Sequence, residues 1–315
     1  MIYTIALNPA IDRTFWVKRI SFEESNRVDQ ECRYAGGKGI DVSRVLTGLG
    51  LPNLALGFAG GYTGEELECR LINEGVESDF VHISHETRTN IIVHETTTGR
   101  QILLTASGPE VTPHELGRLL SQIETLEEPS YVVLGGSLPK GVNPEIYRRI
   151  IRRMRRRGAV TLLDADRDAL RIGIEGCPDY IKPNIHELGR LVGRRLTTVK
   201  EVLAAADEVR SSWPVTVLAS MGAQGMVMAG ESSRYWARPP AVDAVNTTGV
   251  GDSAVAGFIY GLAKGLGVEQ SLRYATAAGT ATALKPGTAK CTKEDVMDML
   301  PKIELKDLGE GGDDS

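Results

Sequence analysis

Short apolar runs alternate with helix-like segments along most of this chain of 315 residues. The runs are short and continuous, which is typical of buried strands. They cover residues 2–7, 53–60, 131–136, 160–165, 180–184 and 215–220. Apolar residues at helical spacing predict helices over 39–49 and 63–75. The alternation predicts an α/β fold with one doubly wound, mostly parallel sheet, helices on both faces, and ligands at the carboxyl ends of the strands.

Two segments interrupt this alternation. Residues 13–20 and 27–35 mix aromatic and charged residues in a strand-like pattern, and 90–106 resembles a hairpin with "TTTGR" as its turn. Strand pairs inserted early in an α/β chain can form a small separate sheet. We therefore expect a β-sheet lid built from about 13–35 and 88–106.

Composition excludes several classes of function. The net charge of −5 argues against a nucleic-acid binder. The seven arginines of 147–158 flank an apolar stripe at helical spacing, so we interpret them as the solvent face of an amphipathic helix. No run of about 18 apolar residues predicts a membrane span, and no signal-peptide pattern is present. The four cysteines are far apart, which favours free thiols. These patterns predict a cytoplasmic protein.

The sequence "GVGDSA", Gly249 to Ala254, fits a permissive dinucleotide-binding fingerprint. That fingerprint needs a strand after its helix, whereas the residues that follow here predict a helix and then another helix. The alternative is a turn whose backbone N–H groups bind phosphate, with Asp252 as a general base. Asp252 could instead cap the helix, and the motif alone leaves this choice open.

The segment 34–46, "YAGGKGIDVSRVL", places three glycines and Lys38 before a predicted helix. Its turn could expose N–H groups to a phosphate, or it could be only a tight strand-to-helix turn. Gly39 follows Lys38 where a Walker motif needs Ser or Thr, so the chain is not a Walker-type kinase.

Two more segments follow predicted strands. In "KPNIHEL", 182–188, Asn184 and Glu187 could order the waters of a Mg²⁺ ion, or they could form a capping box. In "SMGAQG", 220–225, a glycine turn could contact a nucleotide.

Taken together, these motifs resemble the PfkB family of ribokinase-like sugar kinases, over nearly the whole chain. "GGKGIDVSRVLTGLG" looks like the first family signature, "NTTGVGDSAVAGF" looks like the second, and "KPNIHEL" is similar to the Asn-x-x-Glu motif. The resemblance implies one kinase domain over 1–302 and a homodimer formed through the lid, and the acidic, glycine-rich composition of the chain end predicts a disordered tail over 303–315. It also implies ATP and Mg²⁺, and it allows K⁺.

"TIALNPAIDRTF", "TRTNI" and "GGSLPKGV" narrow the resemblance to the branch that phosphorylates fructose 1-phosphate, tagatose 6-phosphate or fructose 6-phosphate. Fructose 1-phosphate is favoured, and a phosphosugar sensor without catalysis is the alternative from another class. By this resemblance the catalytic residues are Asp252, Gly249, Val250 and Gly251. The sugar and its phosphate are bound by Asp12, Arg27, Gly36, Gly37, Lys38, Asp41, Arg88, Asn90 and Ser137. ATP is bound by Lys182, Asn184, Ser220, Gly222, Gly225, Thr248, Gly249 and Gly251, and Mg²⁺ by Asn184 and Glu187 through water.

Two positions depart from the family pattern. Many members have Asp where this chain has Asn246, which affects the usual monovalent-cation arrangement. The branch usually has Asn where this chain has Asp41. An ionised Asp only accepts hydrogen bonds, so its carboxylate should lower the affinity for a phosphosugar unless a cation or hydroxyl offsets its charge.

Overall fold

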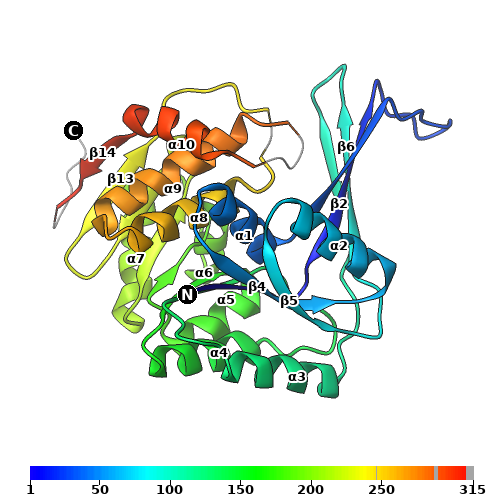
Figure 1. Ribbon diagram of the computed structural model, residues 1–315. Helices are drawn as coiled ribbons and strands as arrows, with labels where there is room; N and C mark the ends of the chain where they lie inside the picture. Colours follow the sequence, from blue (N-terminus) through cyan, green and yellow to red (C-terminus); the bar gives the residue numbers. More distant parts are fainter. Residues whose placement is uncertain (246, 287–289, 310–315) are drawn as a thin grey trace.

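Ten strands form one large sheet in the computed structural model, which describes residues 1–245, 247–286 and 290–309 (Figure 1). From edge to edge they are β14 (Glu304–Asp307), β13 (Arg234–Arg238), β12 (Met226–Ala229), β11 (Thr216–Ser220), β10 (Tyr180–Ile181), β9 (Val160–Asp164), β8 (Tyr131–Gly135), β1 (Ile2–Ala6), β4 (Asn53–Ala59) and β5 (Glu77–His82). The seven strands from β11 to β5 are parallel, and β12, β13 and β14 extend the sheet by antiparallel pairing, each with the strand before it. The predicted mostly parallel sheet is confirmed.

Helices cover both faces of the large sheet, as predicted (Figure 1). The helices are α1 (Lys38–Gly48), α2 (Gly61–Asn73), α3 (Pro113–Glu124), α4 (Glu145–Arg156), α5 (Arg167–Gly173), α6 (Ile185–Leu191), α7 (Val199–Ser212), α8 (Val250–Ala263), α9 (Gly267–Ala283) and α10 (Lys293–Met299), with 3-10 turns at Ile174–Gly176, Gly222–Gln224 and Leu300–Lys302. Helices α3 to α7 share one hydrophobic core, and α1, α8, α9 and α10 share another. Because both faces are covered, strands such as β1 are buried along their whole length.

Helix α4 has the amphipathic pattern expected from its arginines. Ile146, Ile150, Ile151 and Met154 are buried in the core, whereas most of its arginines are exposed. The two helices predicted after the "GVGD" turn are also present, since α8 packs directly along α9. No strand separates them, which removes the structural basis for a dinucleotide fingerprint there.

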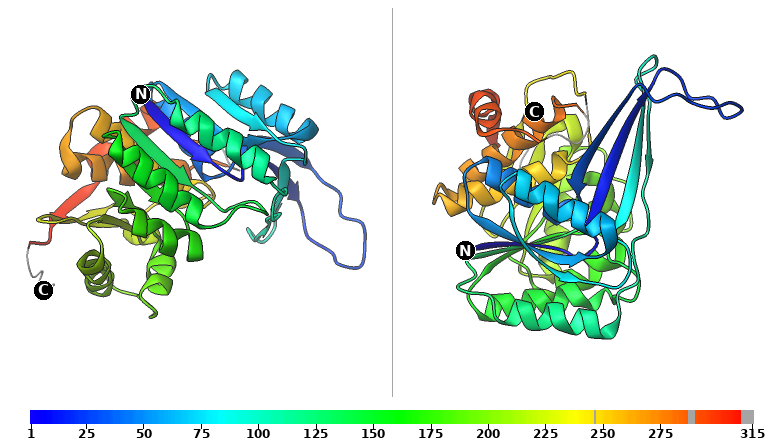
Figure 2. Two further views of the ribbon diagram at one scale, coloured as in Figure 1. Left: turned by 90° about the horizontal axis from the view of Figure 1, so that it is seen from below. Right: turned by 45° about the vertical axis from the view of Figure 1, so that its right-hand side comes forward.

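Four strands form a separate small sheet that projects from the body (Figures 1 and 2). In spatial order they are β3 (Gln30–Gly36), β2 (Ala10–Val17), β6 (Arg88–Glu95) and β7 (Gln101–Leu104). The predicted hairpin is confirmed as β6 and β7. Leu103 and Leu104 of β7 are exposed, which is compatible with the dimer expected through this sheet. The closing movement and the dimer stay predictions.

The prediction that the chain becomes disordered from residue 303 is wrong for its first part. Glu304–Asp307 forms β14, which pairs with β13 at the edge of the large sheet. Leu305 packs against the core there, so local burial and backbone pairing outweigh the acidic composition. Residues 310–315 lie outside the described residues. Within the described ranges, none of the helices has both the length and the apolar character required to cross a membrane.

Candidate active site

The order in which the chain adds strands to the sheet reverses between β1 and β8. From β1 the chain winds to β4 on one side, and from β8 it winds through β9 and β10 to β11 on the other. Ligands of open α/β sheets bind at such a point, outside the carboxyl ends of the strands. Helix α1 begins close to this point. A Cβ built on Gly135, at the end of β8, would lie only 3.2 Å from the Cβ of Lys38, the first residue of α1. The N-cap of α1 is Gly37, whose φ of 107° few other residues adopt.

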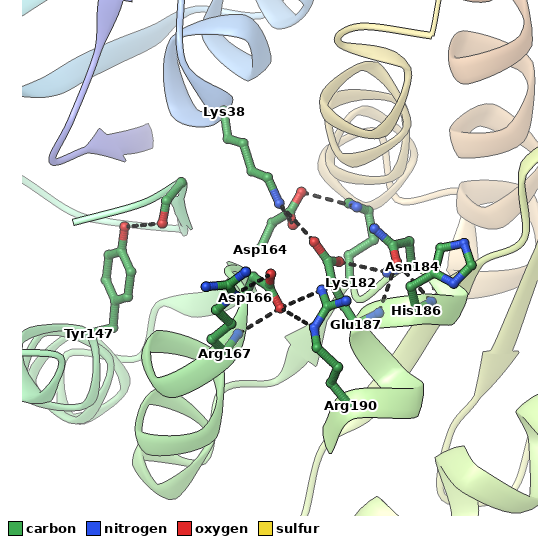
Figure 3. Close-up of polar contacts among 11 residues, drawn as sticks. Lys38, Tyr147, Asp164, Asp166, Arg167, Lys182, Asn184, His186, Glu187 and Arg190 are labelled. Carbon is green, nitrogen blue, oxygen red and sulfur yellow. Dashed lines mark hydrogen bonds and ion pairs between the residues drawn. The ribbon is translucent and has the colours of Figure 1, made fainter. Parts of the chain in front are cut away.

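Asp164, at the carboxyl end of β9, joins two lysines (Figure 3). Its Oδ1 lies 2.7 Å from Lys38 Nζ and its Oδ2 lies 3.1 Å from Lys182 Nζ. The side chains of Asp164 and Lys182 are buried, and Lys38 is one-third exposed. Burial raises the pKa of Asp164, but the charges of Lys182 and Lys38 outweigh burial and hold that pKa below its usual value. Sequence analysis missed Asp164, although a carboxylate at the end of an apolar strand was a usable signal.

Asn184 and Glu187 form a capping box at the start of α6 (Figure 3). Asn184 Oδ1 accepts hydrogen bonds from the N–H groups of His186 and Glu187, both at 2.9 Å, and Glu187 Oε2 accepts one from the Asn184 N–H at 2.8 Å. The capping alternative is therefore what the structure shows. Glu187 Oε1 takes no part in the box and lies 3.6 Å from Lys38 Nζ. This oxygen is a hard donor of the kind that Mg²⁺ takes directly or through water, but within the described part of the chain it belongs to no group of three or more possible metal ligands.

Helix α8 begins opposite these lysines. Its N-cap is Gly249, in the left-handed conformation at φ 76°, and no side chain of a described residue caps it. Thr248 precedes this glycine, Val250 and Gly251 supply the first N–H groups of the helix, and a Cβ built on Gly251 would lie 3.2 Å from Lys182 Nζ. The turn therefore presents backbone donors beside a buried cation, as an anion site requires.

Asp252 is the third residue of α8 and is buried. Since Gly249 holds the N-cap position, the capping alternative for Asp252 is wrong. Burial, and then the charges of Asp41 and Asp164, raise the pKa of Asp252 to about 7, against the opposing effect of Lys38 and Lys290. A carboxyl group with this pKa is poised to exchange a proton near neutral pH.

The small sheet supplies Asp12 on the other side of this centre. Asp12 on β2 lies opposite Asn90 on β6, and Asn90 Nδ2 donates to Asp12 Oδ1 at 2.8 Å. A Cβ built on Gly36 would collide with the Asp12 carboxylate, so only glycine leaves room for that carboxylate. Burial and the charge of Asp41 raise the pKa of Asp12 to about 6, although the Asn90 hydrogen bond lowers it.

Arg88 and Ser137 meet at one residue between β1 and β2, Asn8. Arg88 Nε and Nη2 donate to the Asn8 carbonyl at 3.1 and 2.8 Å, and Arg88 Nη1 donates to the Ala106 carbonyl at 2.7 Å. Asn8 Nδ2 donates to Ser137 Oγ at 3.1 Å. The fold thus brings the two predicted phosphate-binding residues together, with Arg88 holding main-chain carbonyl groups.

Asp41 is buried in α1 and is paired with two cations. Arg44 Nη1 lies 3.1 Å from its Oδ1, and Lys290 Nζ lies 3.2 Å from the same atom. Two cations that can offset the charge of Asp41 are therefore present. Sequence analysis named neither: Arg44 lies within the segment 34–46 but was given no role, and Lys290 lies in no motif.

The remaining predicted residues lie further out. Ser220 ends β11 and bridges to Asn184, and Gly222 and Gly225 enclose the turn that follows, which places this segment beside the capping box. Arg27 is exposed in the segment between β2 and β3, and it forms no side-chain hydrogen bond or ion pair with the described residues. The structure does not bring Arg27 to the centre. Asn246 lies outside the described residues.

Comparison with known proteins agrees with the family resemblance of the sequence motifs. Residues 4–295 match the pfkB family of carbohydrate kinases. The chain is 34% identical to the 1-phosphofructokinase of Borreliella burgdorferi, over 98% of this chain and 99% of that protein. It is 33% identical to the tagatose-6-phosphate kinase of Staphylococcus epidermidis, over 97% and 99%. The phosphofructokinase-2 of Escherichia coli, solved in complex with substrates and products, superposes with a TM-score of 0.91 at 32% identity, over 95% and 98%.

Proposed function

This chain belongs to the pfkB family of carbohydrate kinases, and from that premise we propose that it phosphorylates fructose 1-phosphate on its 6-hydroxyl with ATP. The family and its relatives make the chain a phosphotransferase that acts on a sugar hydroxyl. The observation that carries the proposal is the position of Asp252. This buried carboxylate lies in the first turn of α8, where the charges of Asp164 and Lys38 on one side and of Asp41 and Lys290 on the other all affect its pKa.

The proposed reaction uses Asp252 as the base. As the 6-oxygen of the sugar forms its bond to the γ-phosphorus, the bond from that phosphorus to the β-phosphate oxygen breaks, and ADP leaves. The proton of the sugar hydroxyl passes to Asp252, whose raised pKa suits it to accept a proton at neutral pH. The N–H groups at Gly249, Val250 and Gly251 would neutralise the charge that develops on the phosphoryl oxygens.

Lys38 and Lys182 would bind phosphate oxygens while Asp164 holds both ammonium groups in place. The carboxylate of Glu187, with Asn184 beside it, would hold Mg²⁺ through water. When bound, that ion would neutralise charge on the ATP phosphates. Asp12 and Asp41 would accept hydrogen bonds from sugar hydroxyl groups, and Arg88 and Ser137, which both contact Asn8, would bind the 1-phosphate.

The test is ADP release by the purified chain over a panel of fructose 1-phosphate, tagatose 6-phosphate, fructose 6-phosphate and unphosphorylated fructose. We expect the highest kcat/KM with fructose 1-phosphate and the lowest with fructose, because fructose cannot engage the arginine and lysine side chains. A tenfold preference corresponds to about 1.4 kcal/mol of transition-state binding. A preference for tagatose 6-phosphate would reassign the substrate, and no ADP release with any sugar would refute the kinase.

The pH dependence of kcat/KM should follow Asp252. Its carboxyl group is protonated below its pKa of about 7, and a protonated acid cannot accept the sugar proton. We therefore expect kcat/KM at saturating ATP and Mg²⁺ to rise with pH through about 7 and then to level off. Asp12, with a pKa of about 6, steepens the acid side of the profile. A value of kcat/KM that stays constant as pH falls below 6 would contradict the assignment of Asp252.

A further inference from the structure

Lys290 reaches the reaction centre from a distant part of the chain. It lies between α9 and α10, whereas its partner Asp41 lies in α1. The Nζ-to-Oδ1 distance is 3.2 Å, and the two side chains are only 6% and 4% exposed. An ammonium group buried to this degree loses most of its hydration, which costs free energy that other interactions of the group must offset.

The charge of Lys290 points toward the phosphate-binding turn. A Cβ built on Gly249, the N-cap of α8, would collide with Lys290 Nζ and would lie 3.7 Å from Asp41 Oδ2. Nζ therefore lies against the turn whose N–H groups we assign to the transferred phosphoryl group. Its charge also acts on Asp252 and Asp12, since it opposes the rise that burial causes in the pKa of both carboxyl groups.

Asp41 has a second cation beside it, Arg44, whose guanidinium is shared between two carboxylates. Arg44 Nη1 lies 3.1 Å from the same Oδ1 atom, and Arg44 Nε lies 2.6 Å from Glu74 Oε2. A buried ion pair is often no more stable than a neutral pair of similar size. An ammonium group carries three N–H donors, and apart from the ion-pair contact with Asp41, Lys290 Nζ has no hydrogen-bond acceptor within the described part of the chain. An anion bound at the turn could accept a hydrogen bond from one of the remaining donors.

We propose that Lys290 is a further catalytic residue, which binds an oxygen of the phosphoryl group during its transfer, and that Asp41 positions it. This proposal rests on the kinase function proposed above. On this view, the carboxylate at position 41 keeps a cation at the junction of the sugar and phosphate sites, where a neutral Asn could not. The ion pairs of Asp41 with Arg44 and Lys290 both use Oδ1, so its Oδ2 could accept a hydrogen bond from a sugar hydroxyl.

The test compares Lys290→Met, Asp41→Asn and the double variant in the full chain, with ADP release and thermal unfolding as measurements. For Lys290→Met we expect kcat to fall about 10- to 100-fold, because one charge stabiliser of the transition state is lost. KM for fructose 1-phosphate should change less than about threefold, since the interaction forms mainly in the transition state. The double variant should have a kcat as low as that of Lys290→Met.

The double variant separates this role from simple neutralisation. It leaves no unpaired buried charge, so it carries the test even if Lys290→Met does not fold. Recovery of wild-type kcat in the double variant would overturn the proposal, because Lys290 would then only offset Asp41. A near-normal kcat in folded Lys290→Met would overturn it as well. If the wild-type chain releases no ADP with any phosphosugar, the proposed function fails instead.

Lys285 provides the matched control. It precedes Lys290 in the same connection, and its Nζ pairs with Asp295 at 2.8 Å, with both side chains about one-third exposed. Lys285→Met removes a lysine ion pair outside the centre. Its kcat and KM should match those of the wild type, and an equal loss of kcat in this control would mean that the connection, not Lys290, matters.

Discussion

Replacing Asp252 with asparagine is expected to lower kcat about 100-fold or more while fructose 1-phosphate still binds. The substitution keeps the shape of the side chain and removes the group that accepts the sugar proton, and a positioned general base contributes about 10²- to 10⁴-fold. Binding should persist because Asp12, Arg88 and the backbone donors of the turn are unchanged. The measurement is ADP release under saturating substrates, together with a direct titration of the sugar.

The same substitution should not weaken the fold. The pKa of Asp252 is raised to about 7 from an ordinary value of 3.8, so ionisation of this group opposes folding, and its contribution to stability falls as pH rises between those values. Removing the carboxylate should therefore leave the melting temperature at neutral pH unchanged or higher. Activity is therefore expected to fall without a loss of stability, which a purely structural role for Asp252 would not produce.

Glu201 gives a control at the same helical position. It is the third residue of α7, where it forms a capping box with Thr198, far from the centre. Glu201→Gln should retain full kcat, since its hydrogen bonds serve only that helix end. If Asp252→Asn retained kcat as well, the sugar proton would be taken by another group and the proposed mechanism would be wrong.

Much of the fold could be predicted because burial leaves a clear pattern. The parallel strands are buried on both faces and appear as continuous apolar runs, as in β1 and β8. The antiparallel edge was not predicted. Strand β12 follows a glycine turn that we interpreted only as a nucleotide contact, and β14 lies in an acidic segment whose composition suggested disorder. Pairing with a neighbouring edge strand decides both, and such pairing is not visible locally.

The residues of the candidate site also divide into those that local sequence indicates and those that only tertiary packing brings together. Lys38, Asn184 and Asp252 follow glycine turns or strand ends, so local sequence pointed to them, and the fold brings their segments to one edge of the sheet. Asp164 has a local signal that was not used. Lys290 has none, because it lies between two helices and meets Asp41 only through tertiary packing. Residues of this kind require the structure.

Replacing Asp164 with asparagine is expected to damage both stability and activity. The amide cannot neutralise the buried ammonium group of Lys182, and its own N–H donors would face a lysine that is also a donor. Breaking a buried ion pair by removing one partner costs about 3–5 kcal/mol. We expect a loss of this size in the free energy of unfolding measured in urea at neutral pH. We also expect kcat to fall, because Lys38 and Lys182 lose the carboxylate that positions them.

The pH dependence of unfolding tests the cause of this loss. The pKa of Asp164 is depressed in the folded state, so its stabilisation is complete above the ordinary Asp pKa of 3.8 and disappears as pH falls through the lower folded value. The difference between wild type and Asp164→Asn should therefore be constant near neutral pH and shrink only in strong acid. A difference that vanished already at pH 5 to 6 would implicate a group with a higher pKa, such as Asp12 at about 6.

Asp166, two residues after Asp164, provides a control in which a charged pair is lost from a partly exposed position. Its carboxylate pairs with Arg190 at 2.8 Å, but the two side chains are 34% and 49% exposed (Figure 3). Exposed pairs contribute about 0–1 kcal/mol, and asparagine serves equally well as the N-cap that Asp166 provides to α5. Asp166→Asn should therefore unfold almost like the wild type. Equal losses of unfolding free energy in Asp164→Asn and Asp166→Asn would mean that burial of Asp164 between two lysines adds nothing to stability. Asp164 would then not be needed to hold Lys38 and Lys182 in place for phosphate binding.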